Sequence, residues 1–466
     1  MKKGAAALIM IFFLALGFAA WGAYSLNDDA LSLTITSEPL LGESALGDFP
    51  VTERSQLALR VLFTADSAGA NSVEWLRESE SFYSWEPVLT LGSYSPYYGV
   101  TFSTSGSGSS PEELLDAGGE TEFYAWDGLD RSFIAYASER AEPVWGEQTL
   151  RISLGDFTGG YLPVGAVLNS GDGVDVSEYF PVPLPEGAAA DVRITLTPPG
   201  PENGYSGSVS YDIEPALGAQ YLSAAGGAVD AGEWSYFLFY AYEADTDGNF
   251  VRRLDGSMLP GGGWGVWRVP CEGEGEERSP DFARAELVVP MDWGWEGACL
   301  GLSDDGGELL VFTTEGRELW LNAYSLEGEP GSRVRLSDGW EYYNIDGLEV
   351  LTGQDCAGID CVGAFCAAVK SGGEWRAAAA LELDTLPGGG EEYAYWYGEP
   401  EITSRGGRLA LLVEGNLLLP GEGYSGRIRI RRLCVFEDGS LTSCELIRSQ
   451  LDGVRGRIAA ETVFSE

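Results

Sequence analysis

Short apolar runs separated by turn residues dominate the sequence after its first 30 residues. Runs of roughly five to nine aliphatic and aromatic residues alternate with clusters of Gly, Asp, Pro and Ser, and the chain contains 64 glycines. This alternation is typical of antiparallel strands joined by turns, because aromatic and β-branched residues favour strands while Gly, Asp and Pro favour turns. The sequence therefore predicts a mainly β protein.

One internal segment carries helix signals instead. Ser110 is suited to cap a helix, Pro111 suits the first helical position, and two acidic residues follow in the first turn. We therefore expect one short helix over Pro111–Asp116. The apolar run Ser132–Ala137, by contrast, is expected to be a strand.

The N-terminal residues have the pattern of an export signal. Lys2 and Lys3 form a basic end, and residues 4–24 carry no charged side chain. About 20 apolar residues span a bilayer as a helix, so an uncleaved anchor is favoured, which makes the protein a single-pass cell-membrane protein with its C-terminal bulk extracytoplasmic. The alternative is a signal peptide cleaved near residue 22, after which the protein is secreted.

Composition excludes several kinds of site. The chain has no histidine, which excludes Ser-His-Asp and Cys-His catalytic groups and imidazole metal ligands. Its 72 acidic residues outnumber 28 basic ones and give a formal charge of −44, so nucleic acid is not an expected partner. Any enzymatic activity would rely on carboxylates, and a non-enzymatic role is favoured.

The seven cysteines all lie in the C-terminal half of the chain. An odd number leaves at least one thiol without a disulfide partner in the same chain. Cys434 and Cys444 flank a turn between two strand-like runs, so a hairpin brings them near each other. A two-residue turn at Asp438 and Gly439 would put them out of register by one residue, so a disulfide and two buried thiols both stay open.

The segment 304–336 has the clearest repeat-like order. A glycine-bearing polar turn precedes an apolar strand, a Glu-Gly turn and a second strand with a tryptophan, and another glycine turn and strand follow. In this order the segment resembles the blades of quinoprotein-like β-propeller repeat proteins. It is also similar to the membrane-anchored, exported propeller-like proteins of Gram-positive bacteria. The resemblance implies a radial array of four-stranded sheets. No cofactor carries over, because the sequence holds no matching ligand set.

The expected organisation has three parts. Residues 1–25 are the anchor or signal, residues 26–205 form an N-terminal β-rich region, and residues 206–466 form a propeller-like β-rich region. The N-terminal region is expected to be either further blades or a β-sandwich, because its strand alternation and turn spacing fit both.

One acidic loop has spacing that suits calcium. Asp245, Asp247 and Asn249 place oxygen-bearing side chains at alternating positions. Phe250 and Gly256 stand where an EF-hand has Gly and Glu, so an EF-hand is excluded. A looser calcium site and an ordinary hairpin turn are the alternatives, and no other cofactor is expected.

Aromatic and acidic residues also alternate in a segment before a predicted strand. Trp293 and Trp295 are candidate platforms for sugar rings, and Asp292 and Glu296 are candidate acceptors for sugar hydroxyl groups. Aromatic residues also fill β cores, so core packing is the alternative at these positions.

These patterns favour a membrane-anchored, extracytoplasmic β-rich protein with a non-enzymatic binding or scaffolding role. Its expected partners are the membrane, through residues 4–24, and either a protein or a glycan. The alternative function is that of a carbohydrate-binding or carboxylate-dependent carbohydrate-active surface protein.

Overall fold

Strands account for nearly all the regular structure in the computed structural model, which confirms the prediction of a mainly β protein. The structure describes residues 32–56, 61–65, 71–75, 90–91, 97–104, 110–120, 133, 135–162, 164–167, 173–184, 186–198, 205–214, 221–245, 250–273, 279–292, 294–341, 345, 348–361, 363–387, 394–396, 400–418, 427–452 and 459–464. The predicted anchor at residues 4–24 lies outside them. Among the described residues, no helix has the length and apolar character needed to cross a membrane.

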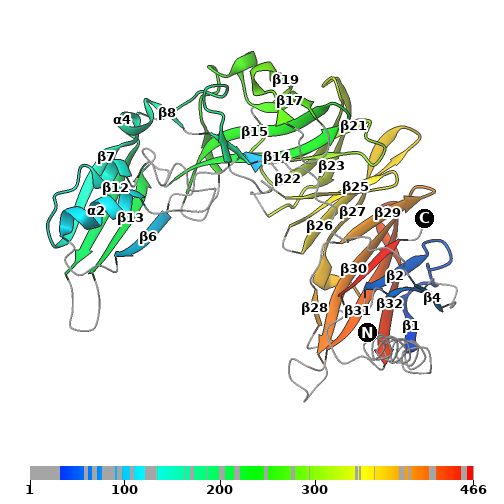
Figure 1. The fold of residues 1–466 in the computed structure, drawn as a ribbon. Coiled ribbons are helices and arrows are strands. Elements are labelled where there is room, and N and C mark those ends of the chain that lie inside the picture. Colours follow the sequence, from blue (N-terminus) through cyan, green and yellow to red (C-terminus); the bar gives the residue numbers. More distant parts are fainter. Residues whose placement is uncertain are drawn as a thin grey trace, which may run out of the picture.

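Three antiparallel sheets form the middle of the chain (Figure 1), and each is built from strands that follow one another in sequence. We call them the first, second and third central sheets. The first contains β14 (Tyr221–Ala231), β15 (Trp234–Ala244), β16 (Phe250–Arg253), β17 (Gly265–Glu272), β18 (Ser279–Pro280) and β19 (Glu286–Pro290). The second contains β20 (Gly297–Leu302), β21 (Glu308–Glu315), β22 (Glu318–Ser325) and β23 (Pro330–Ser337). The third contains β24 (Val350–Gly353), β25 (Cys356–Cys361), β26 (Ala364–Ser371) and β27 (Glu374–Glu382).

One strand of each sheet packs against the corresponding strand of the next. β14 contacts β20, β20 contacts β24, and β24 contacts β29 (Glu401–Arg405). Glycines permit this close approach, because a Cβ on Gly301 of β20 would overlap the Val350 side chain, and one on Gly353 would overlap the Ile402 carbonyl. The sheets consequently follow one another along an arc, coloured from green to orange in Figure 1.

The two ends of the chain meet at one end of this arc. A terminal sheet has the order β1-β32-β31-β30-β28, with β29 also paired to β30, and a neighbouring sheet has the order β33-β2-β3-β4. Arg405 Nη1 donates to the Asp48 carbonyl at 2.7 Å, and Arg408 Nη2 lies 2.9 Å from Asp48 Oδ2, so side chains also join the two ends. The strands are β1 (Ser32–Leu41), β2 (Val51–Gln56), β3 (Val61–Ala65), β4 (Asn71–Trp75), β28 (Ala394–Trp396), β30 (Arg408–Leu418), β31 (Arg427–Glu437), β32 (Ser440–Asp452) and β33 (Ala459–Phe464).

A separate sheet with helices lies at the other end of the arc (Figure 1). Its order is β6-β13-β12-β7, and α2 contacts β6 and β13. The elements are β6 (Tyr97–Thr104), α2 (Pro111–Glu120), β7 (Gly146–Ser153), α4 (Leu154–Thr158), β12 (Ala189–Thr197) and β13 (Tyr205–Glu214). Two small sheets, β10-β9-β5 and β11-β8, consist of β5 (Thr90–Leu91), β8 (Tyr161–Leu162), β9 (Gly165–Val167), β10 (Gly173–Asp175) and β11 (Val182–Pro183).

The helix predicted after Ser110 is confirmed as α2. Glu113 N donates to Ser110 Oγ at 3.3 Å, and Ser110 N donates to Glu113 Oε2 at 3.1 Å, which is a capping box. The strand expected over Ser132–Ala137 is wrong, because residues 133 and 135–138 are helical. Phe133 and Ala137, four positions apart, are both fully buried, so a helical face covers the core there.

The sheets divide the chain differently from the expected regions 26–205 and 206–466. β13 begins at Tyr205 and completes a sheet with β6, β7 and β12, which come earlier in the chain. The first two strands pair instead with strands at the far C-terminus. Strand pairing therefore joins segments that are distant in sequence.

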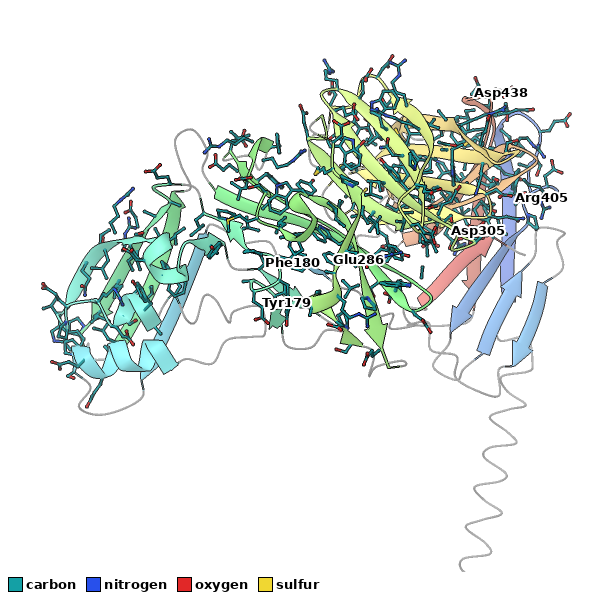
Figure 2. The ribbon with its side chains drawn as sticks, turned by 90° about the horizontal axis from the view of Figure 1, so that it is seen from above. Tyr179, Phe180, Glu286, Asp305, Arg405 and Asp438 are labelled. Carbon is teal, nitrogen blue, oxygen red and sulfur yellow. The ribbon has the colours of Figure 1, made fainter. Side chains whose placement is uncertain are left out.

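Phe180, in the N-terminal half of the chain, packs against the first central sheet. Its ring is fully buried and meets the rings of Phe237 and Trp267 edge to face, at centroid distances of 5.5 and 5.4 Å. In Figure 2, Phe180 and its neighbour Tyr179 lie beside the sheet that carries Glu286. Burial of such rings is a major stabilising contribution, so this contact stabilises the packing of the segment around Phe180 on the first central sheet.

The close approach of β20 to β24 generates a stability prediction. Gly301→Ala should lower the free energy of unfolding by about 1–3 kcal/mol, because the added methyl overlaps Val350 in a packed interior. Chemical denaturation measures this change. Gly227→Ala is the matched control, since its Cβ would find its nearest neighbour at 3.9 Å, an ordinary contact. Adding Val350→Ala should recover only part of the loss, because the Cβ at position 350 would still lie 2.5 Å from the added methyl. Equal costs for the two glycine variants would contradict the packing described.

Candidate functional site

A pocket opens between the segment that links β19 to β20 and the strands β22 and β23. Its volume is approximately 400 Å³, which lies within the range of small-molecule sites. It is lined by Pro290, Met291, Asp292, Trp295, Asn322, Ala323, Tyr324, Pro330, Gly331, Ser332 and Arg333. The pocket thus combines aromatic rings, both signs of charge, an amide and a hydroxyl, and it spans the junction of the first and second central sheets.

Arg253 of β16 holds the linking segment in place. Its guanidinium donates to the Asp292 carbonyl at 3.1 Å and also to the Trp295 carbonyl. Asp292 Oδ1 in turn accepts from Gly294 N at 3.0 Å, which closes a local turn. Burial lowers the pKa of Arg253 from its ordinary value. Arginine side chains nevertheless stay charged at neutral pH in proteins. The two hydrogen bonds from Arg253 to main-chain carbonyls therefore preorganise the linking segment, which forms one wall of the pocket.

Trp295 lies deeper than an open sugar platform would. It is 3% exposed and belongs to the main core cluster, while still lining the pocket. Most of its ring therefore packs against the core. Asp292 lines the same pocket and is exposed, so the structure brings these two sequence-predicted residues to one site.

The opposite wall comes from β22 and β23. Arg333 Nη2 lies 2.6 Å from Glu315 Oε1, and its guanidinium sits over the Trp320 ring at 4.3 Å from the centroid. The Asn322 amide donates to the Val311 carbonyl at 3.2 Å and to a neighbouring threonine hydroxyl. These contacts fix two polar groups at the pocket before any ligand arrives.

Tyr324 adds an aromatic ring with a hydroxyl to the same wall. Burial raises the pKa of this tyrosine above its ordinary value, so its hydroxyl stays protonated at neutral pH. A protonated phenol both donates and accepts hydrogen bonds. The walls as a whole therefore offer donors and acceptors close to apolar surface.

The remaining sequence-predicted residues are placed as follows. Glu296 Oε2 accepts from Gly316 N at 3.2 Å and is not among the residues lining the pocket. Trp293, Asp247 and Asn249 lie outside the described residues. Asp245 is described, and within the described part of the chain no cluster of three or more acidic or cysteine residues is arranged to hold a metal ion. Calcium binding stays a prediction.

Sequence reasoning missed the wall formed by Asn322, Tyr324 and Arg333. One signal was available, since Asn322 interrupts the apolar strand Glu318–Ser325 and Tyr324 follows on the same face two residues later. A buried amide in an apolar strand usually has specific partners. The contribution of Arg333 had no such signal, because it depends on the register between two strands.

Comparisons with known proteins add little. No protein-family model matches the sequence, and no curated protein matches it either. A solved chain from a structural and mechanistic study of two prolyl endopeptidases aligns with 81% of this chain at 11% identity and a TM-score of 0.19. The alignment spans only 55% of that chain. A TM-score this low carries no argument about fold or activity.

Proposed function

We propose that this chain is a membrane-anchored, extracytoplasmic binding protein with no catalytic role, and that its ligand is a carbohydrate held in the pocket between β19–β20 and β22–β23. The observation that carries the proposal is the pocket itself, where Asp292 and Trp295 meet Asn322, Tyr324 and Arg333. A sugar offers hydroxyl groups that donate and accept alternately beside apolar C–H faces, and these five side chains supply the complementary groups.

The charges in the pocket favour an uncharged ligand. Arg333 is already paired with Glu315, so its positive charge is compensated without a ligand anion. Asp292 adds a carboxylate, which accepts hydrogen bonds from hydroxyl groups and repels anionic ligands. A neutral polyhydroxylated molecule can form hydrogen bonds with both walls without bringing a further charge into the pocket.

We also propose that the three central sheets are propeller-like blades, and their contacts support this. Successive contacts from β14 through β20 and β24 to β29 resemble neighbouring blades of a radial array. The second and third central sheets each contain four antiparallel strands. The second central sheet includes the segment 304–336, which resembles a blade in sequence. The absence of histidine from the whole chain supports a binding role over catalysis.

Glycan binding by the full-length chain in mild detergent tests the pocket. A glycan array should give a specific hit, and calorimetry on that glycan should show roughly tenfold weaker binding for Asp292→Asn and for Tyr324→Phe. One lost hydrogen bond costs about 0.5–1.5 kcal/mol, and 1.4 kcal/mol corresponds to a factor of ten. Asp292→Asn is a mild change, because asparagine can still accept the hydrogen bond from Gly294 N. Tyr324→Phe is also mild, because it removes only the hydroxyl group.

Matched controls lie away from the pocket. Asp304→Asn changes an exposed turn, and Tyr161→Phe changes a tyrosine that is 39% exposed in β8, so both should bind like the parent chain. If no glycan binds, or if the pocket variants bind as tightly as these controls, the carbohydrate assignment is wrong.

The membrane-anchored part of the proposal has its own test. The intact chain should stay in the membrane fraction after alkaline carbonate washing, because residues 4–24 are long and apolar enough to span a bilayer. Immunoblotting of pellet and supernatant measures this distribution. Replacing Leu8 and Leu14 with arginine should release the chain, whereas a shorter soluble form from the unaltered chain would indicate cleavage near residue 22 instead.

A further inference from the structure

The β31–β32 hairpin contains an extra residue that changes which side chains face each other. Its turn is Asp438-Gly439, both with positive φ, and Glu437 then pairs with Ser440. The register shifts by one between Phe436 and Val435, which leaves Thr442 as a β-bulge. Beyond the bulge, Cys434 stands directly opposite Cys444.

The two sulfur atoms lie together inside the core. Cys434 Sγ and Cys444 Sγ are 3.3 Å apart, and both residues are fully buried within one apolar cluster. Directly opposed antiparallel residues have Cα atoms about 4.5–5.5 Å apart, which lies within the range of Cα separations that a disulfide spans. Figure 2 labels Asp438 at the turn of this hairpin, close to strands from the N-terminal end of the chain.

No other two cysteines face each other in the strand registers of the described residues. Cys356 faces Val369, Cys366 faces Ile359 and Cys361 faces Ala364. All seven cysteines of the chain are among the described residues, and burial raises the pKa of Cys366 to about 12. Burial also raises the pKa of Cys356 and of Cys361. The Cys434–Cys444 pair is distinct from these thiols because its two sulfur atoms face each other.

We propose that Cys434 and Cys444 form a cross-strand disulfide that locks the β31–β32 hairpin. The oxidant is a disulfide, either of a small thiol such as glutathione or of a protein dithiol. One cysteine thiolate attacks the oxidant and forms a mixed disulfide, releasing the first reduced thiol. The second cysteine then attacks its partner's sulfur, which forms the Cys434–Cys444 bond and releases the second reduced thiol. Two protons leave the cysteines and appear on the two released thiols.

The pair reacts before the core closes. Both side chains are fully buried in the folded protein, so an oxidant reaches neither thiol once the hairpin is packed. The folded protein then protects the bond from soluble reductants.

The locked hairpin is the surface on which the N-terminal strand docks. Leu41 of β1 pairs with Cys444, and Ser443 Oγ donates to the Glu43 carbonyl at 2.8 Å. Gly42 passes so close to the bulge that a Cβ there would overlap the Thr442 carbonyl. A covalent link beneath this contact fixes the bulge in the register that β1 requires.

Thiol counting on the purified full-length chain tests the link. After oxidative refolding in a glutathione buffer, alkylation in denaturant without reductant should modify five of the seven cysteines. Peptide mapping should recover Cys434 and Cys444 joined. Alkylation of all seven, or a link between other cysteines, overturns the proposal. The in-cell form of the proposal rests on the extracytoplasmic location, whereas this test in a redox buffer does not.

The locking role is tested by stability under two redox conditions. The parent chain should melt several degrees lower after reduction in denaturant and refolding in reductant, since the link restricts the unfolded chain. Dithiothreitol without denaturant should leave the link intact. Cys434→Ala with Cys444→Ala should melt at the same temperature with and without reductant, and Cys356→Ala, the matched control, should keep the parent's redox dependence. A parent melting temperature that is the same in both conditions overturns the locking role.

Discussion

Main-chain pairing between the first and last strands is the constraint on which the C-terminal part of this fold depends. β1 pairs with β32 from Ser32 to Leu41, and β33 pairs with β2 from Val51 to Gln56. Open strand edges leave backbone donors and acceptors without partners, and each N-terminal strand covers such an edge. The first described strand, β1, therefore lies in the same sheet as C-terminal strands, a few residues after the predicted anchor.

Close packing between sheets follows from the same need to cover β surfaces. Along the arc, glycines such as Gly301 and Gly353 let backbones approach where any side chain would overlap a neighbour. The pocket arises at one of these junctions, because the segment after β19 bridges from the first central sheet to the second. Its polar groups are held by contacts from both sheets, with Arg253 on one side and Glu315 on the other.

Part of the site was visible in the sequence. Asp292 and Trp295 were predicted as ligand contacts, and both line the pocket, although Trp295 is mostly covered by core. Arg333 and Tyr324 were not predicted, because they reach the pocket only through the pairing of β22 with β23. Similarly, the two-residue turn predicted that Cys434 and Cys444 would be out of register by one residue, but the bulge at Thr442 brings them opposite each other.

Local residue preferences were enough to predict the strand-rich class of the fold and the capped helix at Pro111, because both depend on residues near in sequence. Composition was enough to exclude histidine chemistry. The long-range pairing of strands, by contrast, sets which strands are neighbours, how the sheets divide the chain, which side chains share the pocket and which cysteines are opposed. Each of these depends on long-range register, and a shift of one residue exchanges the two faces of a strand.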